Sequence, residues 1–197
     1  MIVSCAFREP YVTHSNKQWE ALRDYNKIRF VNELPYSEGI VKTNIIERFQ
    51  HSLYGFKPHA IQHALDLGEK LIIWFDPSVM PLEDVSTIYE QLKDNDMLII
   101  KGDNNIKDMT SEKALTYFGS ADVNHIGGTI YAFNFNSPKT LEAFNYWKQA
   151  ELDGVFGNQD EFMNGHWADE SCMALSMANA GIEQKQLKFK YRNQKND

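Results

Sequence analysis

Two adjacent acids near the C-terminal end of the chain have the residue types of a catalytic pair. Asp169 and Glu170 stand in "GHWADESCMALSMANAG" (165–181), between a His-Trp pair and a run of small apolar residues. The apolar run predicts a buried helix, and carboxylates are favoured in its first turn by the positive end of the helix dipole. Asp169 is also a good N-cap. The acids therefore either start a helix or face a reacting group as well.

A third acid ends the clearest apolar stretch. Residues 70–75 ("KLIIWF") predict a buried strand, and Asp76-Pro77 follows it directly. Proline cannot continue a strand ladder, so the chain must turn there. By itself Asp-Pro is typical of a turn. Open α/β sheets, however, bind ligands beyond the carboxyl ends of their strands, which makes Asp76 a candidate ligand residue.

Strands and helices alternate along the whole chain. We expect strands at 2–7, 28–31, 70–75, 97–101, 128–134 and 186–191. We expect helices at 16–25, 41–53, 57–67, 81–92 and 137–150, and a last one from the acids onward. This alternation predicts a single α/β domain over residues 1–197, with a mixed, mostly parallel sheet flanked by helices.

Composition excludes several classes of protein. Hydrophobic residues make up 43% of the chain and aromatic residues 13%, which excludes general disorder. No apolar run approaches the roughly 20 residues of a membrane span. A net charge of -7 argues against a nucleic-acid binder. The first residues do not have the pattern of a signal peptide. Cys5 and Cys172 each have apolar neighbours in the sequence. We therefore expect a cytoplasmic protein whose cysteines are reduced core residues.

The end of the chain is basic. Residues 185–197 hold one acid and five basic residues, among them Lys188, Lys190 and Arg192. Such a segment is either a solvated, frayed end or a mobile tail that closes over a polyanionic ligand such as a diphosphate.

Two further motifs supply polar groups. In "YGFKPHAIQHAL" (54–65), Lys57 has two interpretations, a surface charge or a ligand-binding cation. His59 and His63 have the i, i+4 spacing of a metal pair, but without a third ligand an exposed polar face is the better interpretation. In "NHIGGTIYAFN" (124–134), a glycine pair is either a turn or bulge before a strand or a place where a ligand can approach the backbone closely.

The motifs around Asp76 resemble those of GT-A glycosyltransferases, which use nucleotide-sugar donors. In these enzymes an apolar strand ends in Asp-x-Asp, whose acids contact the ribose and a divalent metal that bridges the diphosphate. The chain keeps Asp76 but has Ser78 at the second acid, so the resemblance leaves Mn²⁺ or Mg²⁺ at Asp76 open. "FKP" resembles their Trp-Lys-Pro or Phe-Lys-Pro element, which implies that Lys57 reaches the donor. Arg8, after the first strand, either contacts the nucleotide or pairs with a neighbouring acid.

"GGT" followed by "ADES" resembles the retaining histo-blood-group transferases, glycosyltransferase family 6. Those enzymes carry Gly-Gly-Thr and then Trp-His-Asp-Glu-Ser, whereas here the Trp-His order is reversed and Ala168 intervenes. The resemblance implies that Glu170 is catalytic, that Asp169 contacts a sugar and that the basic tail covers the diphosphate. It also implies a set of sugar or acceptor contacts: Gly127, Gly128, Thr129, His125, His166 and Trp167.

The function expected from these motifs is transfer of a hexose from a nucleotide diphosphate sugar, with a UDP-sugar favoured, to a glycan or other hydroxyl acceptor. In a retaining reaction Glu170 would stabilise the oxocarbenium-like centre or form a covalent intermediate; in an inverting one an acid would deprotonate the acceptor. Two alternatives remain. One is a nucleotidyltransferase-like enzyme, although "CAFREPYVTH" lacks the glycines of a phosphate loop. The other is a catalytically inactive module that binds a nucleotide sugar or a glycan, which Ser78 keeps open.

Overall fold

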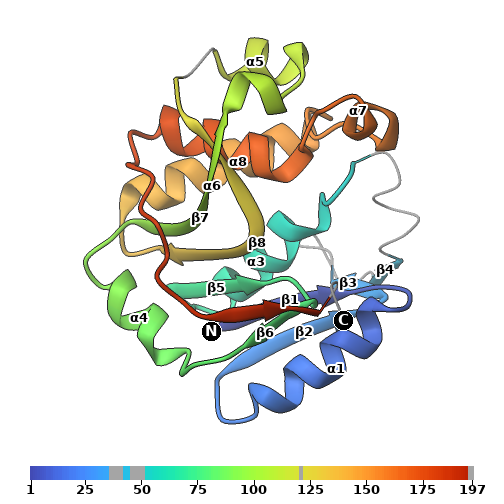
Figure 1. The fold of residues 1–197 in the computed structure, drawn as a ribbon, viewed down its shortest axis with the longest axis vertical. Coiled ribbons are helices and arrows are strands. Elements are labelled where there is room, and N and C mark those ends of the chain that lie inside the picture. The colour runs from blue at the N-terminus through green and yellow to red at the C-terminus, as the bar shows by residue number, and fades with distance from the viewer. Residues whose placement is uncertain (36–41, 45–51, 120–121, 195–197) are drawn as a thin grey trace.

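The computed structural model describes residues 1–35, 42–44, 52–119 and 122–194, and a five-stranded sheet lies at its centre (Figure 1). In spatial order the strands are β2, β1, β5, β8 and β7. Their bounds are Lys27–Val31, Ile2–Ala6, Leu71–Phe75, Asn124–Asn134 and Met97–Asn105.

Four of these strands point the same way. β1 pairs in parallel with β2 and β5, while β8 is antiparallel to both β5 and β7. β7 therefore runs in the direction of β5, and β8 alone is reversed. The predicted mixed, mostly parallel sheet is confirmed.

Helices cover both faces of the sheet. On one face lie α3 (Phe56–Asp66), α6 (Pro138–Leu152) and α8 (Ala168–Asn179), with the short α5 (Glu112–Phe118) beside α8. On the other lie α1 (Tyr11–Ala21), α4 (Ser86–Leu92) and the C-terminal segment. Figure 1 shows α6 and α8 together on one side of the sheet and α1 on the opposite side.

The side-chain alternation of a strand explains the two layers. In β5, Ile72 and Trp74 belong to the core under α3, α6 and α8, whereas Ile73 and Phe75 belong to the core on the other face. A strand covered on both faces is apolar throughout, which is why "LIIWF" could be recognised. Cys5 and Cys172 are buried thiols of the first core.

Several predicted boundaries were wrong because short strands form where helices were expected. The helix expected at 81–92 begins only at Ser86, since β6 (Val79–Pro81) pairs with β9 (Tyr191–Asn193). In the helix expected at 41–53, residues Lys42–Asn44 instead form β4, paired with β3 (Glu33–Pro35). Residues 45–51 of that prediction lie outside the described residues.

Other elements differ in extent or were not predicted. α1 begins at Tyr11 rather than at residue 16. Three short helices had no prediction: α5, α7 (Gln159–Met163) and the 3-10 turn η1 (Ile106–Met109). The described helices include none that is both long and apolar enough to cross a membrane.

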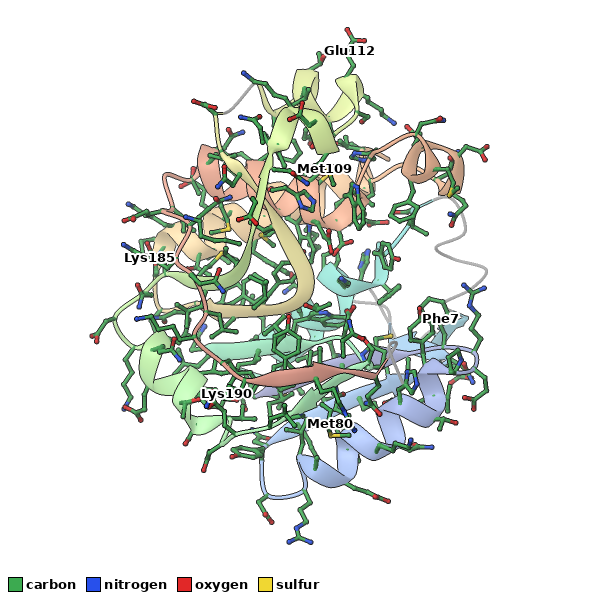
Figure 2. The ribbon with its side chains drawn as sticks, in the orientation of Figure 1. Phe7, Met80, Met109, Glu112, Lys185 and Lys190 are labelled. Carbon is green, nitrogen blue, oxygen red and sulfur yellow. The ribbon has the colours of Figure 1, made fainter. Side chains whose placement is uncertain are left out.

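The basic C-terminal segment lies against the sheet as far as residue 194. Gln186 bridges to Ile99 of β7, and the amide of Lys190 donates to Glu83 Oε1 at 2.9 Å. β9 then pairs with β6, and Gln194 N donates to Ser78 O at 2.8 Å. Figure 2 shows Lys185 and Lys190 along this segment. Residues 195–197 lie outside the described residues.

Candidate active site

Four elements bring polar side chains together at the carboxyl end of β5. Asp76 follows β5, and its amide donates to Thr129 O of the neighbouring strand β8 at 2.9 Å. Because β8 is antiparallel, its first half, with the Gly-Gly pair, lies beside this end of β5. α3 contributes Lys57, and the first turn of α8 contributes Asp169 and Glu170.

A backbone carbonyl holds the start of α8 in place. Met109 O accepts a hydrogen bond from Trp167 N at 3.1 Å and another from Ser171 Oγ at 2.7 Å. Figure 2 shows Met109 beside α8. The sequence suggested Asp169 as the N-cap of this helix, and that prediction was wrong. The helix begins at Ala168 and its N-cap is Trp167, so Asp169 lies in the first turn.

Lys57 is the centre of the cluster. Its ammonium donates to Asp169 Oδ2 at 2.7 Å and to Gly128 O at 2.9 Å, and Nζ lies 3.5 Å from Asp76 Oδ1. The residue is only 2% exposed, which contradicts its interpretation as a surface charge. α3 begins at Phe56, so Lys57 and Pro58 lie in its first turn.

The charge on Lys57 is stabilised by its partners. Burial opposes the charged ammonium, but Asp169 and Asp76 outweigh that effect and raise the pKa of Lys57 above its usual value. Burial raises the pKa of the Asp169 carboxyl, and the Lys57 charge acts in the opposite direction. Tyr131 also donates to Asp169 Oδ2, at 3.2 Å. The result is a buried ion pair whose anionic partner has a second donor.

Glu170 is the more accessible of the two α8 acids. Its side chain is 18% exposed, against 3% for Asp169. The amide of Gly128 donates to Glu170 Oε1 at 2.6 Å. Burial, and next the negative charge of Asp169, raise the pKa of Glu170 to about 8. At neutral pH the carboxyl is therefore mostly protonated, although its surroundings include an N–H donor suited to the ionised form.

A histidine and a tryptophan lie beside Glu170. His125 Nε2 is 3.3 Å from Glu170 Oε2, without the geometry of a hydrogen bond. Burial lowers the pKa of His125 to about 4, so the imidazole is neutral at pH 7. Its ring meets that of Trp167 edge to face, with centroids 5.8 Å apart. Trp167 is 38% exposed and thus presents part of its indole to solvent.

Asp76 is both a turn residue and part of the site. Trp74 Nε1 donates to its Oδ1 at 2.9 Å. Its carbonyl accepts from Val79 N at 2.9 Å, which closes the expected turn, and from Gln18 Nε2 at 2.7 Å. Gln18 also donates to Val79 O at 2.8 Å. Gln18 was not predicted; the only signal was a polar residue four positions before Leu22, the buried residue that follows α1.

Other predicted site residues have different surroundings. Ser78 is fully buried, and in the described part of the chain its Oγ has no hydrogen-bond partner. His166 is buried between Ser111 N, which donates to Nδ1, and Val155 O, 3.0 Å from Nε2. Arg8 is exposed, and its amide, rather than its guanidinium, contacts Asn32.

The remaining predicted residues are also placed. Gly127 lies against Ile100 of β7. Lys188 N donates to Gln91 Oε1 at 3.0 Å, so this part of the tail follows α4. Arg192 belongs to β9, opposite Met80 of β6. His59 is buried with Nε2 2.9 Å from Glu151 Oε2, so the expectation of an exposed histidine face was wrong for it.

The carboxylates near Asp76 do not fit a divalent metal. Among the described residues no group of three or more His, Cys, Asp and Glu side chains is arranged to hold one. The cation beside Asp76 and Asp169 is the Lys57 ammonium. We therefore derive no chemical step through a metal ion.

The fold is similar to that of known glycosyltransferases. The chain matches a glycosyltransferase involved in glycosylation of the major capsid of PBCV-1 at 12% identity, over 94% of this chain and 78% of that one, with a TM-score of 0.55. This likeness, together with the sheet order, identifies the fold as that of GT-A glycosyltransferases.

Two other structures were found at lower similarity. Mouse xyloside xylosyltransferase 1 matches at 9% identity and a TM-score of 0.49, over 94% of this chain and 83% of that one. The galactosyltransferase LgtC matches at 13% identity and a TM-score of 0.46, over 94% and 72%. No family model and no curated protein matches the sequence. The resemblance to family 6 thus rests on the two short motifs alone.

Proposed function

We propose that this protein transfers a glycosyl group, a hexose, from a nucleotide diphosphate sugar to a hydroxyl of a glycan or other acceptor. The observation that carries the proposal is the hydrogen bond between Gly128 N and Glu170 Oε1, 2.6 Å long, beside the Asp76 turn. It places a partly exposed carboxyl next to the strand end where a GT-A fold offers a nucleotide site.

Asp76 marks the donor side of the site. Its carboxylate can accept hydrogen bonds from ribose hydroxyls, and its backbone is held by Thr129, Val79 and Gln18. Lys57 is occupied by Asp169 and Gly128, so its role is to fix these groups rather than to reach the donor. For the diphosphate we favour Arg192, because β9 pairs with β6, which starts three residues after Asp76. A UDP-sugar is the favoured donor.

Glu170 and Trp167 mark the sugar and acceptor side. The space beside Gly128 is filled by the Glu170 and Asp169 side chains, so a sugar at this place would meet the Glu170 carboxyl. The exposed part of Trp167 offers an aromatic face for stacking. Glu170 must be ionised to stabilise positive charge at the anomeric carbon, to attack it or to deprotonate the acceptor. All three roles require Glu170 to lose the proton that burial favours. Glu170 must therefore be ionised whether the reaction retains or inverts the configuration at the anomeric carbon.

Calorimetric titration with UDP and GDP tests the donor half of the proposal. We expect one of them to bind with micromolar affinity and Asp76→Asn to weaken that binding at least tenfold. Asp66→Asn, at the exposed end of α3, is the matched control and should bind as the wild type does. Absence of binding to both nucleotides would contradict the proposed donor class.

A further inference from the structure

Lys57 occupies a cation-binding cage that the fold has built from several elements. Its Nζ contacts Asp169 Oδ2, Gly128 O and, at 3.5 Å, Asp76 Oδ1. It also lies over three aromatic rings, 5.1 Å from the centroid of Tyr54 and 5.6 Å from those of Trp74 and Tyr131. Carboxylates, a carbonyl and ring faces are all groups that attract a cation.

The cage is closed around the ammonium. Lys57 is buried, as is Asp169, and Tyr131 is completely buried beneath them. A divalent ion placed against Asp76 would therefore approach a fixed positive charge inside a region of low dielectric constant, where like charges repel strongly. The ammonium and a metal ion compete for the same oxygen atoms.

Residue 78 does not supply the second carboxylate that a metal site at Asp76 would need. Ser78 is fully buried with a neutral hydroxyl, and its carbonyl is held by the Gln194 amide. Magnesium and manganese prefer carboxylate, carbonyl and water oxygens, and Asp76 is the one carboxylate of the "DPS" turn. Asp169 Oδ2 and Gly128 O are already hydrogen-bonded to the Lys57 ammonium, and Asp76 Oδ1 lies 3.5 Å from it.

We propose that the Lys57 ammonium is the permanent cation of this site, so that the protein needs no divalent metal to bind its donor. Removal of Lys57 then exposes a divalent-metal site formed by Asp76, Asp169 and the carbonyl of Gly128. The statement about donor binding rests on the proposed function, whereas the statement about metal binding does not.

Terbium luminescence tests the metal statement without any nucleotide. Tb³⁺ binds oxygen ligands, and an ion at Asp76 would lie close to Trp74, whose indole would sensitise its emission. We expect no such emission from the wild type and saturable emission from Lys57→Ala, reversed by excess Mn²⁺. Lys93→Ala, which removes an exposed lysine, is the control and should behave as the wild type does.

Three results would overturn the inference. The first is sensitised emission from the wild type that Asp76→Asn abolishes. The second is a folded Lys57→Ala variant that shows no emission. Should that variant fail to fold, Lys57→Gln removes the ammonium charge, keeps an amide that can donate to Asp169, and leaves Asp76, Asp169 and the Gly128 carbonyl in place. The third is failure of Lys57→Gln, when folded, to bind Tb³⁺ more tightly than the wild type.

Calorimetry with UDP and GDP, in EDTA and in Mn²⁺, tests the donor statement. Equal affinity in both conditions supports it. Binding only in Mn²⁺ overturns it and leaves the proposed function standing. Binding of neither nucleotide contradicts the proposed function, and the terbium titration still decides the inference about Lys57.

Discussion

Gly128 and Glu170, 42 positions apart in the chain, are joined by a 2.6 Å hydrogen bond from the backbone amide of one to the carboxyl of the other. This bond connects the "GGT" and "ADES" motifs, which the sequence shows only as separate segments. It also holds the Glu170 carboxyl at Gly128, the residue before Thr129, whose carbonyl accepts from the Asp76 amide.

Gly128 should not tolerate a side chain. A Cβ there would lie 2.8 Å from Cγ and Oε1 of Glu170 and 3.0 Å from Asp169 Oδ2. We expect Gly128→Ala to cost about 1–3 kcal/mol of unfolding free energy and to abolish activity, as overpacking of a buried site does. Gly127→Ala is the control, because its Cβ would meet Ile100 at an ordinary 3.5 Å. Urea denaturation of both variants makes the comparison, and equal stabilities would contradict the geometry.

Lys57 should be essential for stability as well as for the site. Lys57→Met leaves Asp169 buried without its cation, and removal of one partner of a buried ion pair costs about 3–5 kcal/mol. Lys93→Met, at the exposed residue that follows α4, should change the unfolding free energy by less than about 1 kcal/mol. Chemical denaturation measures both. A loss of under 1 kcal/mol for Lys57→Met would show that the ion pair is not buried as described.

The sequence predicted part of this site because each acid ends or begins a regular element. Asp76 could be found from the apolar strand before it, and Asp169 and Glu170 from the apolar helix after them. The orientation of Lys57 could not be predicted, since a lysine in the first turn of a helix usually faces solvent. Its burial depends on Asp169, which is 112 residues away in the chain.

For the fold, too, local sequence patterns predicted some elements and long-range contacts determined the others. Continuous apolar runs that alternate with helical segments predicted the sheet, because both patterns are local in the sequence. β6 was not predicted, and β9 lies at 191–193 instead of the expected 186–191, because their pairing joins residues 79–81 to residues 191–193 and has no local signal. Gln18 was missed for a similar reason. Its side chain donates hydrogen bonds to the carbonyls of Asp76 and Val79, which only the folded chain brings near it.

Gln18 should act on donor binding through the position of Asp76. Gln18→Leu leaves two buried carbonyls with fewer donors, which costs about 1–3 kcal/mol of unfolding free energy. We also expect nucleotide affinity to fall by about tenfold, because the Asp76 turn loses its support. Gln149→Leu, on the exposed face of α6, should leave both quantities unchanged. Calorimetry on the folded variants measures the affinity, and wild-type affinity in Gln18→Leu would remove its positioning role.

Activity should rise with pH. Burial and Asp169 raise the pKa of Glu170 to about 8, and the proposed roles require the carboxylate. We therefore expect kcat/KM to increase as pH rises through about 8 and then to level off. A profile that is already flat between pH 6 and 9 would contradict either the raised pKa or the role of Glu170.

The same ionisation should lower stability as pH rises. The folded protein holds the Glu170 proton up to about pH 8, whereas the unfolded chain loses it near the usual glutamate pKa of 4.5. Between these pH values the folded state binds more protons, so the Glu170 contribution is fully present below about 4.5 and is lost by about 8. The slope is at most about 1.4 kcal/mol per pH unit. Urea denaturation against pH should show this slope in the wild type but not in Glu170→Gln.

The most direct measurement is turnover of a nucleotide sugar by the wild type and by Glu170→Gln, followed as release of the nucleotide diphosphate with and without an acceptor. Glu112→Gln, whose side chain Figure 2 shows at α5, is an exposed matched control. We predict that Glu170→Gln lowers kcat by about 10²–10⁴-fold while the control matches the wild type and both variants stay folded. Wild-type turnover in Glu170→Gln would contradict a catalytic role for Glu170, and no turnover of any nucleotide sugar by the wild type would contradict the proposed reaction.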